Sequence, residues 1–269
     1  MLFTILGSTG FIGKNLVNHL KQLGIEVKTP DIRHENLEKT NLGHVIYAIG
    51  EIKHKGKTQD FINSHIGYLS QILDAANFDS FLYCSATRVY SESIDTNEDS
   101  SLCTNSFNPN NLYTNSKILG ESICLSYNNP KIKIARLSNV TGNNHNSDLF
   151  LPSLIRDAVD KKHIELFTTL QSEKDYVLIN DVVEVLPKIL LDGKFRIYNV
   201  AGGKNITNEE LISKIQEITK CDFSISEHAF DYSFPKIDIS RIKNELNFYP
   251  QSILDNLENI INSYKNQNF

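Results

Sequence analysis

Two short motifs, about a hundred residues apart, carry the residue types in this chain that could do chemistry. The first is a series of glycines, Gly7, Gly10 and Gly13, near the N-terminal end. The second is Tyr113, followed four residues later by Lys117. A glycine loop that leads into a helix can hold a pyrophosphate, and a phenol beside an ammonium can transfer a proton. Together the two motifs predict an enzyme that uses a nicotinamide dinucleotide.

The glycine series lies between a short apolar run, Met1–Leu6, and a stretch with helical spacing of apolar residues, Phe11–Leu23. This strand–turn–helix context distinguishes a dinucleotide-binding loop from an ordinary turn. Gly7 permits the tight turn, Gly10 lets the backbone approach the pyrophosphate, and Gly13 lets the helix pack close to the sheet. The residues expected to contact the cofactor here are Gly7, Gly10, Phe11, Ile12 and Gly13, with Ala48 after a later apolar strand.

The second expected strand, Ile25–Thr29, is followed by two residues that bear on the choice of cofactor. The carboxylate of Asp31 could accept hydrogen bonds from both ribose hydroxyls and repel a 2′-phosphate, which favours NAD. The guanidinium of Arg33 could instead bind that phosphate, so NADP stays open. The interval from Asp31 to Leu42 barely leaves room for a further strand and helix. This short interval predicts a trimmed adenine pocket.

Tyr113 and Lys117 have the spacing that places two side chains on one face of a helix. A phenol with a pKa near 10 is a poor proton carrier at neutral pH. The ammonium of Lys117 and the charge of an oxidised nicotinamide would lower that pKa. Tyr113 could then exchange a proton with a substrate hydroxyl or ketone while hydride moves to or from the cofactor. Lys117 could also hold the nicotinamide ribose.

Apolar runs and helical patterns alternate along the chain, which predicts a mostly parallel sheet covered on both faces. The expected strands are Met1–Leu6, Ile25–Thr29, His44–Ile49, Phe81–Ser85, Ile132–Leu137, Ile164–Phe167, Asp175–Ile179 and Arg196–Val200. The expected helices are Phe11–Leu23, Gln59–Ala76, Leu112–Tyr127, Leu149–Asp160, Asn180–Leu191, Asn208–Thr219 and Ile253–Tyr264. The helix that begins at Asn208 follows a capping-box pattern, Thr207 with Glu210.

Composition narrows the class of protein. The chain has 269 residues, a net charge of −5 and 40% hydrophobic residues, which is ordinary for a globular enzyme and unlike a general nucleic-acid binder. Its four cysteines are scattered and form no metal-binding cluster with histidines. The N-terminal run lacks the basic flank of a signal peptide, and no uncharged stretch approaches the length of a membrane helix. We therefore expect a cytoplasmic protein without a metal, a membrane segment or a nucleic-acid partner.

These motifs resemble those of the extended short-chain dehydrogenase/reductases, in particular the NAD-dependent epimerase/dehydratase family that acts on nucleotide sugars. The glycine series matches the family's GxxGxxG, and Tyr113 to Lys117 matches its YxxSK. The resemblance covers nearly the whole chain. The other segments that carry it are Phe81–Tyr90, Ala135–Gly142, Lys174–Val177 with Asn180–Asp181, and Asp238–Pro250.

The resemblance implies an α/β fold, a doubly wound and mostly parallel Rossmann sheet with a smaller C-terminal α/β lobe that binds the substrate. Residues 1–142 would form the dinucleotide-binding domain, and 175–201 would return to it. Residues 143–174 and 202–269 would form the substrate lobe. A homodimer is expected through the helices around Gln59–Ala76 and Leu112–Tyr127.

The same resemblance suggests residues that would bind a nucleotide-sugar substrate. Asn139 falls at the asparagine of the family's R-x-x-N-x-x-G segment, which helps to hold the substrate. Lys174 takes the place of an arginine that often contacts the diphosphate. His228 falls near a second position that can bind phosphate.

One departure from the family pattern affects the predicted chemistry. Ala86 stands where the family has a serine or threonine whose hydroxyl bonds the reacting sugar oxygen. Ser85 and Thr87 flank it and are candidates to supply that hydroxyl, although neighbours on a strand point to opposite faces. Loss of one such hydrogen bond slows an enzyme by roughly ten- to a thousandfold.

Three functions remain open at this point. The 4,6-dehydratases of the family carry an acidic pair after their threonine, and Thr87-Arg88 stands there, which disfavours a dehydratase. An NAD(P)-dependent epimerase or ketoreductase that acts on a nucleotide sugar agrees best with the motifs. Ala86 also allows a catalytically weak protein that binds dinucleotide and sugar nucleotide. A reductase of a non-sugar ketone or aldehyde is the third possibility.

Overall fold

The computed structural model describes residues 1–50 and 58–267 and divides into two compact units. The first unit comprises Met1–Leu137, Val182–Val200 and Asp238–Phe248. The second comprises Ser138–Asp181, Ala201–Ile237 and the chain from Tyr249 onward. Each unit has its own sheet and its own apolar core.

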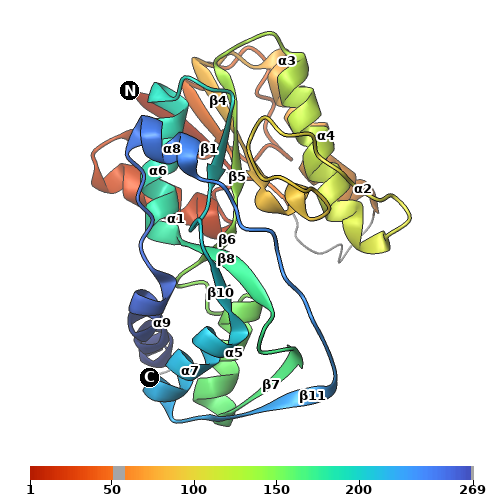
Figure 1. Ribbon diagram of the computed structural model, residues 1–269. Coiled ribbons are helices and arrows are strands. Elements are labelled where there is room, and N and C mark those ends of the chain that lie inside the picture. Colours follow the sequence, from red (N-terminus) through yellow and green to blue (C-terminus); the bar gives the residue numbers. More distant parts are fainter. Residues whose placement is uncertain (51–57, 268–269) are drawn as a thin grey trace. The chain divides into compact units, whose positions relative to one another are not determined.

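The first unit is built on a sheet of six strands in the order β2-β1-β3-β4-β5-β9 (Figure 1). Every pair of neighbours is parallel, so the prediction of a doubly wound α/β fold is confirmed. The order reverses at β1, which has β2 on one side and β3 on the other, and ligands of such sheets bind at this point. The strands are β1 (Leu2–Leu6), β2 (Glu26–Lys28), β3 (His44–Tyr47), β4 (Ser80–Ala86), β5 (Ile132–Leu137) and β9 (Ile197–Val200).

Helices cover both faces of this sheet (Figure 1). One layer holds α1 (Phe11–Gln22), α6 (Ile179–Asp192) and α8 (Ser240–Leu246). The other holds α2 (Thr58–Ile62), α3 (Tyr68–Ala75) and α4 (Leu112–Ser126). Because the sheet is covered on both sides, β4 and β5 are buried along almost their whole length, including Lys133 and Arg136 of β5.

The helix expected over Gln59–Ala76 has an irregular middle. Between α2 and α3 the chain forms a π-helical turn, Asn63–Gly67, instead of continuing as regular α-helix. A π-helical turn accommodates one extra residue, and such turns often mark functional positions. Apolar spacing does not reveal this change of hydrogen bonding, so the sequence predicted a single regular helix.

The chain between β2 and β3 has no strand of its own. Residues 29–43, all of which the structure describes, form turns and a bridge, and β2 is the last strand on its side of the described sheet. The short interval noted in the sequence therefore does leave out the further strand and helix.

The second unit contains two small sheets. One has the order β10-β8-β6, in which β10 is antiparallel and β6 parallel to β8, and the other pairs β11 with β7. The strands are β6 (Asn139–Thr141), β7 (His163–Thr168), β8 (Glu173–Leu178), β10 (Asn205–Thr207) and β11 (Asp222–Phe230). The helices are α5 (Phe150–Arg156), α7 (Asn208–Thr219) and α9 (Ile253–Gln267), and a second π-helical turn, Asp157–Lys161, follows α5.

Several parts of the chain lie in a different unit from the one expected. Residues 175–181 and Ala201 belong to the second unit, whereas the sequence placed 175–201 in the first. Asp238–Phe248 belongs to the first unit, because α8 packs on β9 and Arg241 donates a hydrogen bond to the Ile197 carbonyl at 3.0 Å. Residues 138–142 belong to the second, because β6 pairs with β8.

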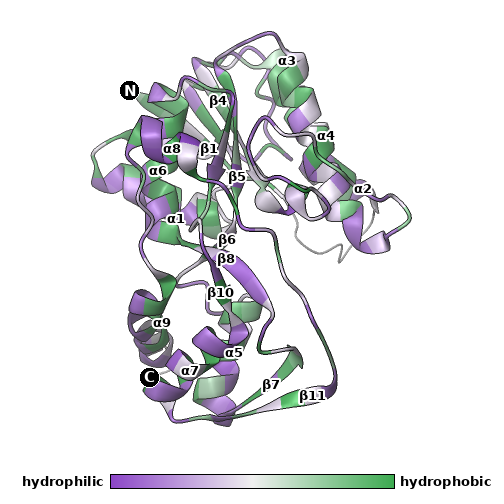
Figure 2. Ribbon diagram, in the orientation of Figure 1, coloured by the Kyte–Doolittle hydropathy of each residue, from purple (hydrophilic) through white to green (hydrophobic). Residues whose placement is uncertain are grey.

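Hydropathy follows this architecture. The helices of both units carry polar and apolar faces, whereas the strands of the six-stranded sheet are mostly hydrophobic (Figure 2). The core of the first unit includes Leu6, Tyr47, Phe81 and Ile134, and that of the second includes Leu166, Leu211 and Leu257. Over the described ranges, no helix combines the length and the apolar character needed to cross a bilayer.

Candidate active site

The glycine loop closes tightly on itself and on the neighbouring strand. Gly7 follows β1 with a φ of +89°, and a Cβ there would lie 2.8 Å from the carbonyl carbon and oxygen of Ala48. A Cβ on Gly13 would lie 2.2 Å from the Gly7 carbonyl oxygen. Both positions therefore require glycine for the packing of the protein itself. Ala48, which follows β3, lies against the loop, and its expected contact with the cofactor stays a prediction.

Gly10 differs from the other two glycines. It has a φ of −73°, and a Cβ there would meet only the Gly7 carbonyl oxygen, at 3.4 Å. Its backbone is exposed, and α1 begins after it without a side-chain cap or an acid in the first turn. Space beside Gly10 and the N–H groups of Phe11, Ile12 and Gly13 are therefore available to an anion. The residues of this loop fit a dinucleotide pyrophosphate.

Asp31 and Arg33, which the sequence set against each other as cofactor determinants, are bound to each other. The Arg33 guanidinium donates to both carboxylate oxygens of Asp31, at 2.9 and 3.0 Å. His34 Nδ1 lies 3.0 Å from the same carboxylate. The hydrogen bonds from Arg33 hold the pKa of Asp31 well below its ordinary value. Arg33 thus neutralises the charge that was expected to repel a 2′-phosphate.

Tyr113 and Lys117 lie on one face of α4, as their spacing predicts. Lys117 is buried, and its ammonium donates to the Cys84 carbonyl at 2.9 Å. The same nitrogen lies 5.8 Å from the centroid of the Tyr113 ring and 4.9 Å from that of Tyr83. Tyr113 is partly exposed, and its hydroxyl has no hydrogen-bond partner among the described residues. A phenol that no protein group holds can bond a substrate.

The electrostatics of the pair differ from expectation in one respect. Burial raises the pKa of Tyr113 to about 12, and the guanidinium of Arg88 opposes that rise. Burial lowers the pKa of Lys117 to about 8. In the protein alone, desolvation therefore outweighs any effect of the ammonium on the phenol.

His65 joins this pair, which the sequence did not indicate. The π-helical turn places its fully buried ring edge-on to Tyr113, with the centroids 5.7 Å apart. His65 Nδ1 lies 3.0 Å from Ser116 Oγ, and Ser116 donates to the Tyr113 carbonyl at 2.7 Å. No spacing rule for regular helices could reveal this contact.

The glycine loop and the Tyr113–Lys117 pair lie close together, at the ends of neighbouring strands of the sheet. A Cβ on Gly50 would lie 3.2 Å from Lys117 Nζ. Gly50 comes two residues after Ala48, which packs against Gly7. The two motifs therefore meet at the carboxyl ends of β1, β3 and β4, where doubly wound sheets bind ligands.

The two hydroxyls that flank Ala86 have different surroundings. Ser85 is buried and donates to Glu121 at 2.5 Å, and Glu121 is in turn paired with Arg136 at 2.7 Å. The hydroxyl of Ser85 is therefore part of a buried ion-pair network, and its catalytic role stays a prediction. Thr87 begins a 3₁₀ turn, Thr87–Tyr90, and its hydroxyl bonds none of the described residues. Thr87 is thus the hydroxyl beside Ala86 that a substrate could use.

In the second unit, Asn139 and Lys174 have partners within the protein. Asn139 donates to the Asp175 carbonyl at 2.7 Å, so its amide fixes β6 to β8. The Lys174 ammonium lies 4.2 Å from the Phe150 ring centroid and 5.2 Å from that of Tyr232. Lys174 is therefore held between two aromatic rings, a contact with no signature in its local sequence.

His228 is not brought to Lys174 by any contact in the second unit. It is an exposed residue of β11, whose backbone N–H bonds Ser226 Oγ. The residue of this stretch that reaches Lys174 is Tyr232.

Comparison with known proteins bears on this site. The model of a family described as "NAD dependent epimerase/dehydratase family" matches residues 3–201. The chain is 25% identical to the dTDP-glucose 4,6-dehydratase of Streptomyces griseus over 203 residues, which cover 71% of this chain and 60% of that protein. It is 25% identical to the uncharacterized UDP-glucose epimerase YtcB of Bacillus subtilis (strain 168), over 96% of this chain and 88% of that protein.

A solved structure shares the arrangement of the whole chain. MoeE5 in complex with UDP-glucose and NAD has a TM-score of 0.82 and a sequence identity of 17%, and the match covers 100% of both chains. At this identity the likeness concerns the fold.

Proposed function

Because the chain belongs to the NAD-dependent epimerase/dehydratase family, we propose that it is an NAD-dependent epimerase or ketoreductase acting on a nucleotide sugar. The observation that carries the proposal is the hydroxyl of Tyr113, which lacks a protein partner in the described chain and stands beside the buried ammonium of Lys117. This pair lies at the sheet edge that also carries a glycine loop fitted to a pyrophosphate.

The first unit would hold NAD through backbone groups. Phe11, Ile12 and Gly13 would direct N–H groups at the pyrophosphate, and the absent side chain of Gly10 would leave room for it. Asp31 would accept hydrogen bonds from the ribose hydroxyls in place of those that it accepts from Arg33. Bound NAD supplies the acceptor and donor of hydride.

Tyr113 would move the proton in this reaction. Its phenol oxygen would take the proton from the sugar hydroxyl as that carbon is oxidised, or return it as a ketone is reduced. Lys117 would stabilise the phenolate, provided that its ammonium stays charged. Thr87 would bond the reacting oxygen in place of the hydroxyl that Ala86 lacks.

Elimination of water is not part of the proposal. Relatives that are 4,6-dehydratases do occur. Acid–base elimination at neighbouring carbons needs proton donors and acceptors beyond the tyrosine. In this chain Thr87 and Arg88 follow Ala86, and neither is a carboxylic acid.

The substrate's diphosphate would be bound in the second unit. Lys174 contributes a positive charge oriented by Phe150 and Tyr232. Asn139, at the start of β6, would orient the substrate through the backbone that it fixes. His228 contributes nothing to this site in our proposal.

A homodimer through α3 and α4 is also proposed. Leu112 and Leu119 lie two turns apart on α4, and their side chains are 46% and 50% exposed. A second copy of the helix pair would cover them.

Ala86 favours a second candidate, a protein that binds NAD and a sugar nucleotide with little turnover. The strand ends at Ala86 without a hydroxyl, and the hydroxyl of Ser85 is bound to Glu121. If the Thr87 hydroxyl does not reach the substrate, neither residue that flanks Ala86 supplies the missing hydrogen bond.

The test is turnover of UDP-, GDP-, CDP- and dTDP-sugars with NAD or NADH, followed by absorbance at 340 nm and by chromatography of the products. We expect Tyr113→Phe to lower kcat by at least about a hundredfold, the usual range for a lost proton carrier. Binding of NAD should be retained. Tyr127→Phe, at the C-terminal end of the same helix, is the matched control.

The outcomes separate the two candidates. Turnover that depends on Tyr113 supports the enzyme. Binding of NAD and a sugar nucleotide without turnover supports the weak binder. Equal activity of Tyr113→Phe and the unaltered protein would exclude the proposed proton carrier.

A further inference from the structure

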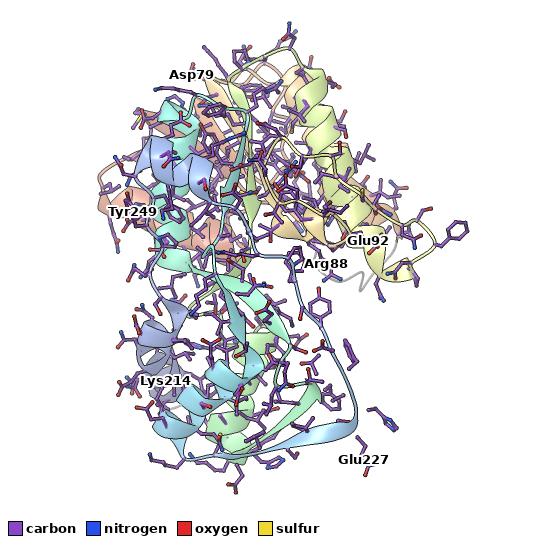
Figure 3. All side chains as sticks on the ribbon, in the orientation of Figure 1. Asp79, Arg88, Glu92, Lys214, Glu227 and Tyr249 are labelled. Carbon is purple, nitrogen blue, oxygen red and sulfur yellow. The ribbon has the colours of Figure 1, made fainter. Side chains whose placement is uncertain are left out.

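One cation at the candidate active site has no role in the chemistry described so far. Arg88 lies in the 3₁₀ turn that follows β4, next to Thr87, and its side chain is exposed (Figure 3). Over residues 1–50 and 58–267, the guanidinium makes no hydrogen bond, ion pair or ring contact. The turn that carries Arg88 contacts α4, the helix of Tyr113, and the guanidinium favours the ionised form of that phenol by lowering its pKa. Arg88 thus stands close to the hydroxyl that would touch the substrate.

The other arginines of the first unit have partners. Arg136 pairs with Glu121, Arg33 with Asp31, and Arg241 with Asp99. Arg196 donates to backbone carbonyls at the end of α4. Arg88 is therefore the arginine of this unit whose five donors are left for a ligand.

Acidic groups of the same region do not neutralise it. Glu121 is occupied by Arg136 and Ser85, and Glu92 accepts a hydrogen bond from Asn111 at 2.6 Å. Two cationic side chains, Lys117 and Arg88, therefore lie near the phenol of Tyr113. Among the described residues, no carboxylate forms an ion pair with either of them. Such a site attracts a negative group on the reacting part of the substrate.

We propose that Arg88 is a specificity residue that selects a nucleotide sugar whose sugar ring carries a carboxylate, that is, a nucleotide-linked uronic acid. The inference rests on the proposed function, because it places a sugar at Tyr113. A guanidinium binds a carboxylate through two parallel hydrogen bonds, which a hydroxymethyl group cannot accept. The carboxylate would also satisfy a cation that the protein leaves unpaired.

The diphosphate of the substrate is a less suitable partner for Arg88. Arg88 lies in the 3₁₀ turn that contacts α4, the helix of Tyr113. The phenol of Tyr113 has to meet the carbon that is oxidised or reduced. An anion at Arg88 therefore belongs to the reacting ring and not to the nucleotide.

The experiment compares matched pairs of ligands that differ only at one carbon of the sugar. UDP-glucuronic acid with UDP-glucose, and dTDP-glucuronic acid with dTDP-glucose, are titrated into the full chain with NAD present, and Kd is measured by calorimetry. We expect the acid to bind more tightly within a pair. Arg88→Gln should weaken binding of the acid by roughly ten- to a hundredfold and leave the neutral sugar within about twofold. Arg88→Lys should lie between the two.

Lys131→Gln is the matched control. It removes the same charge from an exposed side chain that precedes β5, at the opposite edge of the parallel sheet. Its Kd values should equal those of the unaltered protein. The melting temperature of each variant shows that the fold is retained.

The outcomes are distinguishable. Equal binding of acid and neutral sugar, or an equal loss of both in Arg88→Gln, would overturn the selection by Arg88 and leave the proposed function intact. An equal fall in kcat for both sugars, with a shifted pH profile, would make Arg88 a residue that tunes Tyr113 instead. Failure of every nucleotide sugar to bind would overturn the proposed function itself and this inference with it.

Discussion

Lys117 shows how burial shapes chemistry at the scale of single residues. Its ammonium is held by a backbone carbonyl inside the protein, and no carboxylate is bonded to it among the described residues. Because the charged form loses its hydration, the pKa falls to about 8. The residue that should stabilise a phenolate is thus itself close to losing its proton at moderately alkaline pH.

This pKa predicts the alkaline limb of the pH–rate profile. Below pH 8 the ammonium is charged and supports Tyr113; above it the charge is lost, so kcat/KM should fall as pH rises through about 8. Lys117→Arg, which keeps its charge, should remove this limb even if kcat is low. The measurement is kcat/KM between pH 6 and pH 10. A profile that stays level to pH 10 in the unaltered protein would contradict the prediction.

The residues of the candidate site were predictable from sequence only in part. Tyr113 and Lys117 share a helix, so spacing alone places them together. Ser85 looked equivalent to Thr87 because both flank Ala86, and only the tertiary contact with Glu121 separates them. His65 could not be found, because a π-helical turn brings it to Tyr113.

At the scale of elements, the first strand, loop and helix are fixed by close backbone contacts. Gly13 and Gly7 are glycines because the protein leaves no space for a side chain at either position. Gly10 is a glycine that the protein does not itself require. Within this one motif, we therefore expect Gly7 and Gly13 to matter for stability and Gly10 to matter for binding.

Two alanine substitutions should therefore behave differently. Gly13→Ala forces a Cβ to 2.2 Å from the Gly7 carbonyl oxygen, and such overpacking typically costs about 1–3 kcal/mol of unfolding free energy. Gly10→Ala meets its nearest described atom at 3.4 Å and should keep its stability within about 1 kcal/mol. It should nevertheless bind NAD at least about tenfold more weakly, because the methyl group occupies the place of the pyrophosphate.

Urea unfolding and NAD titration measure the two effects. If Gly10→Ala binds NAD as the unaltered chain does, the pyrophosphate does not lie beside Gly10. If Gly13→Ala is as stable as the unaltered chain, the loop can move away from α1.

Elements with a clear hydrophobic period were predicted well, and those held by tertiary contacts were not. The capping box of Thr207 and Glu210 marked the start of α7 correctly. By contrast, β11 is mostly exposed, and a strand exposed on both faces has no alternation to detect. β6 has three residues and exists because β8 lies beside it.

At the scale of the whole molecule, the chain leaves and re-enters its first unit. α8 contributes to that unit through Ile242, which is buried, and Arg241, which bonds β9. Sequence order favoured a single C-terminal lobe, and only the packing of α8 reveals the return. The unit that carries Tyr113 therefore depends on residues from three separate parts of the chain.

The proposed dimer gives a prediction at this scale. Leu119→Glu places a charge on the exposed face of α4 and should yield a monomer, because an unpaired charge is costly to bury in an interface. Sedimentation velocity measures the mass. Ile94→Glu, on a fully exposed side chain outside α4, is the control and should stay dimeric. A monomer before any substitution would contradict the dimer.

The sheet ends early on one side, at the three residues of β2. A dinucleotide whose adenine half meets little protein buries less surface and should have a short residence time, since affinity differences reside mostly in dissociation rates. Epimerisation requires one dinucleotide to remain through removal and return of hydride. A net reduction instead consumes it as a co-substrate that exchanges after every turnover. Within the proposed function, the short sheet margin at β2 therefore leads us to favour one-way reduction over epimerisation.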